Sequence, residues 1–210
     1  MISNRLASWL CTVALLALCG AAQPQTVKAP EELIKEVSSD VLDTVKADTS
    51  IRAGDVQKVI ALVDAKVMPY VNFQRMTASA VGRYWRQATP EQQQKLQAEF
   101  KTLLVRTYAG ALAQVKEQTV QLKPFRAKPE DQEVVVRTEV RGKGEPIQLD
   151  YRMEKRPDGW KIYDVNVLGV WLVENYRNSF AQEIGANGID GLIAKMAERN
   201  KSAAAAGAKS

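Results

Sequence analysis

The feature that most restricts the fold of this chain is a change in the spacing of its apolar residues near Val120. Before that point apolar residues recur every three or four positions, and after it they alternate with polar ones. The connections RGKGEP and KRPDGW are rich in glycine and proline and favour turns. Because connections this short join antiparallel strands, the sequence predicts a four-stranded antiparallel sheet. The predicted strands span 119–125, 132–141, 147–155 and 160–167.

Helices are expected on both sides of the sheet in the sequence. The clearest start signal is TPEQ, in which Thr89 can cap a helix, Pro90 suits its first turn and Gln92 can close a capping box. The order of helices, strands and helices predicts an α+β fold with the helices packed on one face of the sheet. The expected helices span 30–48, 54–67, 73–85, 90–116, 170–184 and 188–200.

The first 22 residues have the pattern of a secretory signal peptide. Arg5 precedes an apolar run of suitable length, and small residues follow up to Ala22, near which we expect cleavage. A membrane anchor is disfavoured because the run is short for a bilayer span. A lipoprotein signal at Cys19 is disfavoured because Leu18 precedes that cysteine.

The leader contains both cysteines of the chain, so the exported protein would need no oxidative folding. An exported chain without disulfides suits a bacterial periplasm. We expect one domain over 23–200 and a disordered, low-complexity tail over 201–210.

Several chemistries lack the residues that they require. The chain has no histidine and, outside the leader, no cysteine, which excludes histidine-based triads, thiol nucleophiles and zinc sites built from these ligands. Asp150 and Asp164 could act as paired carboxylates, but their strand positions predict solvent-facing side chains and a structural role. We therefore expect no metal site and no catalysis that depends on histidine or a thiol.

The charge is mildly basic. The formal net charge is +5, and Arg5 is the one charged residue of the leader, so the exported chain carries about +4. This balance favours transient contact with anionic membrane surfaces, although scattered basic residues also simply keep a surface soluble. No block of lysine and arginine indicates a nucleic-acid partner.

The predicted sheet has one apolar face. In 132–141 and 147–155 the apolar residues share one parity and most charged residues share the other. In 160–167 we assign the odd positions to the apolar face, although Trp160 and Ile162 make the even positions apolar too. This surplus predicts a large apolar cavity between the sheet and the 90–116 helix. Its candidate lining residues are Leu104, Tyr108, Val134, Val136, Val140, Leu149, Tyr151, Met153, Tyr163, Val165 and Val167.

The segment VWLV at 170–173 adds two further candidates. On a helical wheel Trp171 falls about 100° from Leu172 and off the apolar stripe of the 170–184 helix. Either Trp171 and Val170 lie at the mouth of the cavity, where strand becomes helix after Gly169, or the helix starts later and Trp171 packs locally.

Three long blocks resemble one family. They are VMPYVNFQRMTASAVGRYWRQATPEQQQKLQAEFKTLLVRTYAGAL, WKIYDVNVLGVWLVENYRNSFAQEI and GIDGLIAKM. In this order they resemble the MlaC, or toluene-tolerance, family of periplasmic phospholipid-binding proteins of the Mla lipid-transport system, over essentially all of 30–200. Trp171 stands where the family pattern has a small residue.

The resemblance implies an NTF2-like cone whose cavity holds the acyl chains of a glycerophospholipid, with the headgroup outside and no cofactor besides this cargo. It also implies a carrier and not an enzyme. It implies two membrane partners, an outer-membrane lipoprotein–porin complex and an inner-membrane ABC transporter with an MCE-domain subunit. The alternative is an NTF2-like enzyme that acts on a small apolar substrate with Tyr151 or Tyr163 and a carboxylate.

Overall fold

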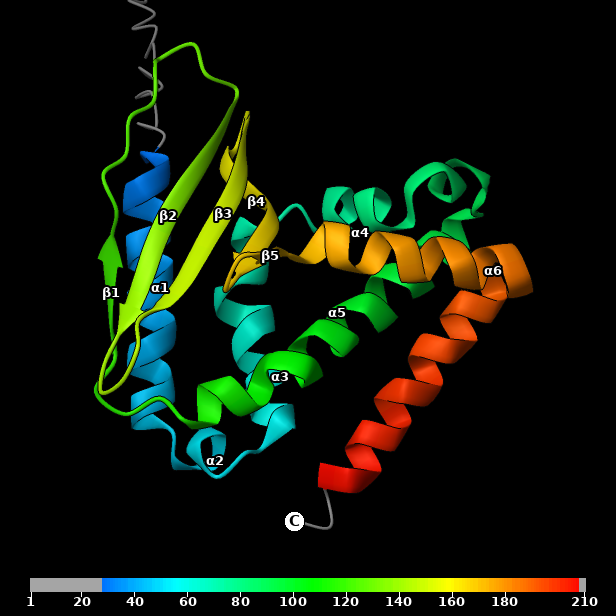
Figure 1. Cartoon of the computed structure of the whole chain (residues 1–210), viewed down its shortest axis with the longest axis horizontal. Coiled ribbons are helices and arrows are strands. Elements are labelled where there is room, and N and C mark those ends of the chain that lie inside the picture. The colour runs from blue at the N-terminus through cyan, green and yellow to red at the C-terminus, as the bar shows by residue number, and fades with distance from the viewer. Residues whose placement is uncertain (1–27, 208–210) are drawn as a thin grey trace, which may run out of the picture.

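The computed structural model describes residues 28–207 of the chain. It is an α+β fold, as predicted, with helices before and after one antiparallel sheet (Figure 1). The helices before the sheet are α1 (Pro30–Ala47), α2 (Thr49–Arg52), α3 (Val56–Lys66), the 3₁₀ turn η1 (Met68–Tyr70), α4 (Phe73–Val81), the 3₁₀ helix η2 (Gly82–Gln87) and α5 (Pro90–Ala113). The strands are β1 (Thr119–Leu122), β2 (Glu133–Arg141), β3 (Ile147–Arg156), β4 (Gly159–Val167) and β5 (Val170–Trp171), and α6 (Leu172–Gly207) follows.

The sheet has five strands rather than the predicted four. They lie in sequence order, β1 to β5, and every neighbouring pair is antiparallel. The additional strand is β5, in which Val170 pairs with Val167 and Trp171 pairs with Asn166. These two residues were expected to begin a helix, but the turn at Leu168 and Gly169 returns them to the edge of β4 before α6 starts.

A β-bulge between Arg152 and Met153 changes which residues of β4 face each side of the sheet. Tyr151 pairs with Val165, but Met153 pairs with Ile162, so one residue of β4 is passed over. We call the side that carries Val136 and Met153 the inner face and the opposite side the outer face. As a result of the bulge, Ile162 and Trp160 join the buried inner face, which corrects the predicted parity at the start of this strand, whereas Val165 and Val167 keep it.

Local sequence signals account for most helix boundaries. At the start of α5 both predicted capping-box bonds are present, from the Gln92 amide to the Thr89 hydroxyl (3.2 Å) and from the Thr89 amide to the Gln92 side chain (3.0 Å). In α6 the backbone leaves helical geometry at Gly188 (φ 72°), which divides the segment into two helices close to the predicted boundary. The second helix continues to Gly207, into the tail predicted to be disordered, where a run of alanines has high helix propensity.

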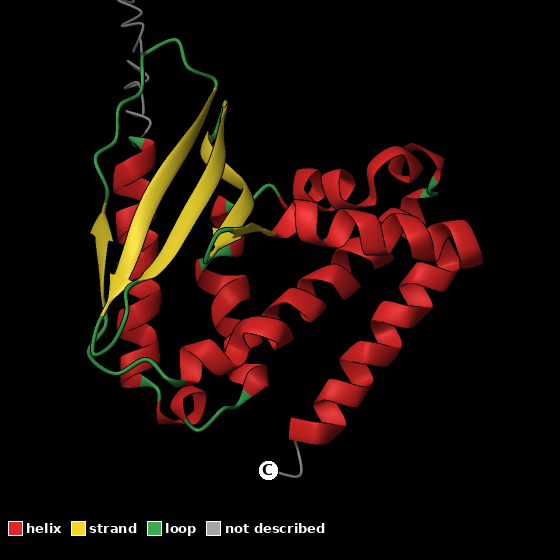
Figure 2. Ribbon diagram, in the orientation of Figure 1, coloured by secondary structure: helices red, strands yellow, loops and turns green. Residues whose placement is uncertain are grey.

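The helices do not all pack on one face of the sheet, contrary to prediction, and α4 and α6 lie beside the sheet, past its β5 edge (Figure 2). Helix α1 packs against the inner face, whereas α4 contacts outer-face side chains. Arg75 and Asn72, at the start of α4, bond the carboxylate of Glu154 on β3 at 2.6 and 2.5 Å. The segment before α4 also lies along the free edge of β4, because the Asn72 amide donates to the Ile162 carbonyl (2.8 Å).

The buried apolar residues form three clusters instead of one core. The sheet cluster joins α1 to the inner face and contains Leu33, Ile34, Val37, Val136, Met153, Trp160 and Ile162. The lower cluster joins α1, α2, α3 and α5 and contains Leu42, Val45, Ile51, Val59, Leu62, Val105, Ala109 and Val115. The helical cluster joins α4, α5 and α6 and includes Met76, Leu96, Phe100, Tyr176, Phe180 and Met196. None of the helices within residues 28–207 is long and apolar enough to cross a membrane.

Candidate functional site

The predicted lining residues differ in how deeply they are buried. Val136 and Met153 are fully buried in the sheet cluster against α1. Val170 is 49% exposed. The other ten are half-buried: Leu104, Tyr108, Val134, Val140, Leu149, Tyr151, Tyr163, Val165, Val167 and Trp171. Most of the predicted set therefore retains accessible surface despite its apolar character.

Burial is inverted across β3 and β4 near their junction with β5. On the outer face the polar residues Asp164 and Asn166 are 1% and 5% exposed. On the inner face the apolar residues Val165 and Val167, which alternate with them, are only half-buried. A half-covered sheet normally buries its apolar face and leaves its polar face in water. In this region the apolar face is the one that lacks a complete cover.

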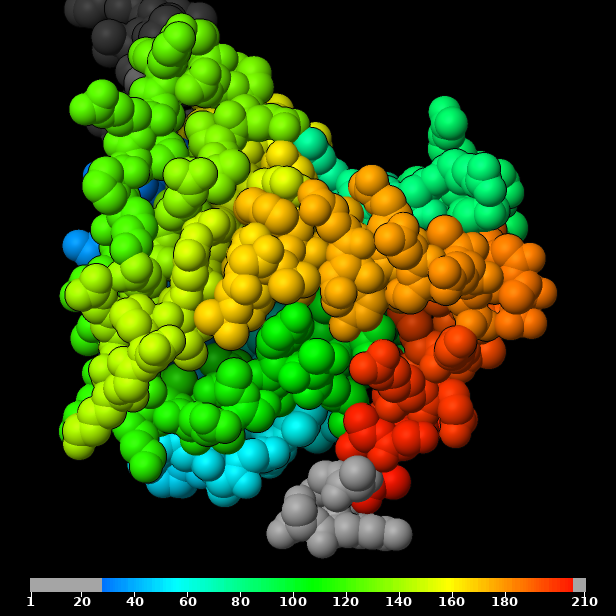
Figure 3. Space-filling model, in the orientation of Figure 1, coloured from blue at the N-terminus to red at the C-terminus, as the bar shows by residue number. Residues whose placement is uncertain are grey.

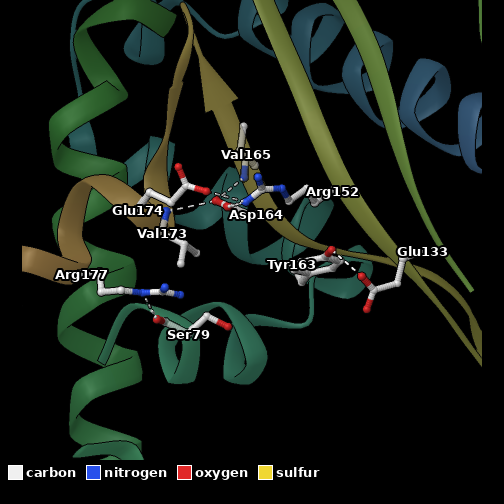
Figure 4. Close-up of polar contacts among 9 residues, drawn as sticks. All are labelled: Ser79, Glu133, Arg152, Tyr163, Asp164, Val165, Val173, Glu174 and Arg177. Atoms are coloured by element: carbon white, nitrogen blue, oxygen red, sulfur yellow. Dashed lines mark hydrogen bonds and ion pairs between the residues drawn. The ribbon is translucent and has the colours of Figure 1, made fainter. Parts of the chain in front are cut away.

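Asp164, on β4, is buried because its carboxylate caps the start of α6. Its carboxylate accepts hydrogen bonds from the backbone amides of Val173 (3.1 Å) and Val165 (2.9 Å) and pairs with the Arg152 guanidinium at 3.0 Å (Figure 4). A carboxylate at a helix N-terminus satisfies amides that have no partner within the helix. Asp150 is buried as well, at 7% exposure, so the expectation that both aspartates face solvent is wrong. Burial raises the pKa of Asp164.

Tyr151 occupies the middle of the inner face. Its hydroxyl interacts with the hydroxyls of Ser38 on α1 and Thr138 on β2, and burial raises the pKa of the phenol above its ordinary value of 10.0. The side chain nevertheless keeps accessible surface. Tyr151 thus packs against the sheet cluster and is incompletely covered by protein.

The half-buried residues lie between the three clusters. Val165 packs against both the sheet cluster and the helical cluster, and Leu104 packs against the helical cluster. Within the part of the chain that the structure describes, four of the half-buried predicted residues on α5 and the inner face pack into none of the clusters: Tyr108, Val140, Leu149 and Val167. A folded domain usually has one contiguous core, so these unclustered residues mark the place where this core is interrupted.

Exposed apolar side chains gather where β3 begins and β4 turns into β5. Ile147, Leu168 and Val170 are 40%, 65% and 49% exposed, and the Leu168 amide donates to the Gln148 carbonyl (3.1 Å), which brings the turn beside the start of β3. We call these three residues the apolar lip. In Figure 3 the surface between the sheet and α5 is formed by β4, β5 and the first turns of α6. The lip continues the inner face, since Ile147 pairs with Val140 and Val170 pairs with Val167.

Trp171 lies on the outer face, not at the mouth of an inner cavity. It pairs with Asn166, and the Arg152 guanidinium lies 3.9 Å from the centre of its ring. Arg152 in turn bonds Asp164 and Glu174. The prediction that Trp171 lies at the mouth of the cavity is therefore wrong, because Trp171 packs locally in a polar cluster. The wheel argument failed because this residue is extended rather than helical.

Tyr163 is also displaced from its predicted position, because the bulge turns it toward the outer face. Its hydroxyl donates to the Glu133 carboxylate (2.9 Å) (Figure 4). The Arg75 guanidinium lies 3.6 Å from its ring centre. The hydrogen bond from Arg75 lowers the pKa of Glu133, and burial raises the pKa of Tyr163. Both shifts disfavour proton transfer at neutral pH, so the tyrosine–carboxylate pair needed by the enzyme alternative is present but poorly suited to it.

The described residues contain no group of three acidic side chains placed to hold a metal ion. What the arrangement offers is an incompletely covered apolar face with an apolar lip. Sequence parity identified most of that face, but it missed Ile147 and Leu168, which lie in or beside turns.

Comparison with known proteins places the chain in a family. A solved structure that it resembles is a phospholipid-binding protein from Ralstonia solanacearum in complex with a phospholipid, with 52% sequence identity, a TM-score of 0.82 and coverage of 84% of this chain and 99% of that one. The intermembrane phospholipid transport system binding protein MlaC of Haemophilus influenzae is 25% identical over 172 residues, 80% of each chain. The toluene tolerance protein ttg2D of Pseudomonas putida is 26% identical over 198 residues, 90% of this chain and 92% of that one. The family model of the MlaC protein matches residues 35–198, and the chain therefore belongs to the MlaC family.

Proposed function

We propose that this protein is a periplasmic phospholipid carrier that moves glycerophospholipid between outer-membrane and inner-membrane Mla complexes and so maintains outer-membrane lipid asymmetry. The observation that carries the proposal is the inverted burial of β3 and β4, where polar side chains are enclosed and apolar ones are not. Burying apolar surface is the main favourable term in folding, so an apolar face left open suggests a further apolar component. An acyl chain is such a component.

The position of Tyr151 supports an interior site for that component. Tyr151 packs against the sheet cluster and still keeps accessible surface, as expected of a residue that borders a space for cargo. Two residues that pack into no cluster lie near it on the same face, Leu149 on its own strand and Val167 on the next. We infer that acyl chains occupy the region between the three clusters and complete the core.

The size of the apolar term determines how cargo can leave. Burying one methylene contributes about 0.8 kcal/mol, so two chains of about fifteen methylenes contribute roughly 24 kcal/mol. Release into water is therefore negligible. The lipid has to pass directly from one apolar environment to another, and the exposed apolar lip at the end of the inner face suits the place of transfer.

The names of the relatives support the same cargo. The Ralstonia protein, at 52% identity, was solved with a phospholipid, and the Haemophilus relative is named for intermembrane phospholipid transport. We extend both statements to this chain. The expected partners are an outer-membrane lipoprotein–porin complex and an inner-membrane ABC transporter with an MCE-domain subunit. Periplasmic location depends on the leader over 1–22, which lies outside the described residues.

Organic extraction of the purified protein followed by mass spectrometry tests the proposal. We expect glycerophospholipid in a fixed molar ratio to protein. A second assay follows transfer of a fluorescent phospholipid between donor and acceptor vesicles. Protein that holds no lipid and does not accelerate transfer would contradict the proposal.

A matched pair of variants locates the site. Val167→Glu places a carboxylate on the open inner face, where acyl chains would exclude water, whereas Val135→Glu places the same group on the outer face of β2, where Val135 is 39% exposed. Val167→Glu should lose the co-purified lipid, and Val135→Glu should keep it. Equal lipid content in the two variants would show that the lipid binds elsewhere.

A further inference from the structure

A second surface has the character of a binding site and is separate from the inner face. It is an open pocket of about 720 Å³ between α4, η2 and α6. Four arginines line it, together with Tyr84 and Trp85, and no acidic residue lines it. In the neighbouring pocket of about 680 Å³ the charges are balanced, because three acidic and three basic side chains line it. We call the 720 Å³ pocket the arginine pocket.

Three of its arginines have guanidinium groups available for a ligand. Arg83 donates to the Tyr84 hydroxyl (2.9 Å). Arg177 donates its Nε to the Ser79 carbonyl (3.1 Å) (Figure 4), and this bond does not involve its two terminal nitrogens. Arg86 is exposed. Among residues 28–205, none of the three has a carboxylate within 4.0 Å.

The remaining arginine of the pocket, Arg75, is paired with carboxylates. Arg75 lies between the two pockets and bonds the carboxylates of Glu133 and Glu154, each at 2.6 Å. The positive charge of Arg75 is thereby compensated within the protein. The other three arginines line the same pocket without a carboxylate partner among residues 28–205, and like charges gathered in one pocket cost free energy unless an anion joins them.

The aromatic residues of η2 add an apolar element beside these charges. Tyr84 and Trp85 are half-buried and pack against the helical cluster on one side. Gly82 (φ 64°) turns the chain from α4 into η2. In Figure 3 this segment projects from the molecule on the side away from β1. Tyrosine, tryptophan and arginine on a projecting segment are the residue types that settle at the headgroup level of a bilayer.

We propose that the arginine pocket binds the headgroup phosphates of an anionic bilayer and is the surface by which the protein contacts the membrane. Arginine forks match phosphate oxygens, and the ring pair suits the interface next to them. The proposal extends the carrier function but does not depend on it, because the pocket and the apolar lip are built by different elements. Bilayer contact can therefore leave the transfer surface unobstructed.

Co-sedimentation with vesicles tests the proposal. The protein should bind vesicles of phosphatidylethanolamine and phosphatidylglycerol, should not bind phosphatidylcholine vesicles, and should be released by salt. Each arginine near an anionic surface contributes about a fivefold change in partition, so replacing Arg83, Arg86 and Arg177 together by glutamine should weaken binding by about a hundredfold. Co-purified lipid should not change in this variant, which separates this proposal from the carrier function.

The control removes the same charge at exposed positions elsewhere, by glutamine substitution of Arg52, Lys58 and Arg137. This control should keep at least most of the vesicle binding. Equal loss in the two triple variants would mean that net charge alone drives binding and would overturn the proposal. Unchanged binding in the arginine-pocket variant would also overturn it.

A second measurement does not rely on removing the arginines. In the leader-free protein with Trp160 and Trp171 replaced by phenylalanine, Trp85 is the one remaining indole. Its fluorescence should be quenched by brominated lipid in the phosphatidylglycerol vesicles. Absence of quenching in protein that sediments with vesicles would overturn the proposal. The proposal would also be overturned if a hexaglutamate peptide or inorganic phosphate changed Trp85 fluorescence while the protein did not bind vesicles. The pocket would then bind an acidic protein or a soluble anion instead of a bilayer.

Discussion

Two valines on the same face of the sheet allow the open inner face to be distinguished from ordinary core. Val136 is fully buried in the sheet cluster, whereas Val167 is half-buried and packs into no cluster. Truncation to alanine removes the same atoms from each. For a fully buried valine the transfer loss is about 1.6 kcal/mol at 0.8 kcal/mol per methylene, and the cavity left behind raises the cost to about 2–3 kcal/mol.

We therefore expect Val136→Ala to lower the free energy of unfolding by about 2–3 kcal/mol in both lipid-free and lipid-loaded protein. Val167→Ala should cost less than about 1 kcal/mol in lipid-free protein, because water already reaches the side chain. With lipid bound, the same truncation removes contacts to acyl methylenes. It should therefore lower the stabilisation that lipid provides and speed lipid loss by up to about tenfold.

Urea unfolding followed by circular dichroism, on delipidated and reloaded protein, gives the two free energies, and transfer of labelled phospholipid to vesicles gives the rate. If Val167→Ala destabilises delipidated protein as much as Val136→Ala does, the inner face is closed core and the reasoning from inverted burial fails. The same conclusion would follow if lipid stabilised both variants equally.

Three further variants test individual contacts. Tyr151→Phe should lower the free energy of unfolding by about 1 kcal/mol, since it removes one set of buried hydroxyl interactions; lipid transfer should be unchanged, and a large loss of transfer at full lipid content would instead indicate a chemical role for the hydroxyl. Trp171→Ala should lower stability by about 1–2 kcal/mol through loss of its stacking with Arg152 and leave co-purified lipid unchanged; loss of lipid without loss of stability would return Trp171 to the mouth of the site. The hydrogen bond from Arg75 lowers the pKa of Glu133 below its ordinary 4.5, so this carboxylate stabilises the fold above that pH, and the contribution disappears as the pH falls through the lower folded pKa. Urea unfolding at a series of acidic pH values should therefore show that the free energy of unfolding falls less steeply with falling pH for Glu133→Gln than for the unsubstituted protein. Equal pH dependence in the two proteins would contradict the assignment.

Local patterns were sufficient to predict most of the elements. Alternation placed the strands 132–141, 147–155 and 160–167 within about one residue of β2, β3 and β4, because each has a short turn at its end. The capping box fixed the start of α5, and the glycine-containing GANG segment marked the division of α6. These features depend on residues close in sequence, which is why the sequence alone revealed them.

The predictions that failed depended on contacts between distant segments. No residue near Tyr163 in the sequence indicates the bulge that turns its side chain outward, because the register of β4 is set by pairing with β3. Asp164 has the position of a solvent-facing strand residue, and only the return of α6 over β4 encloses it. Trp171 was assigned to a helix because its apolar neighbours fit a helical wheel, but the edge of β4 was available for pairing.

The division of the buried residues into three clusters has a consequence for how the protein unfolds. Each cluster joins a different set of elements, and few side chains connect one to another; Val165 and Val71 are among those that do. Without cargo, the helical cluster and the sheet cluster can open separately, so amide hydrogen exchange should reveal units of unequal stability and thermal unfolding should broaden. Bound acyl chains touching all three would couple them into one cooperative transition. The cargo would then decide whether this chain behaves as one folding unit or several.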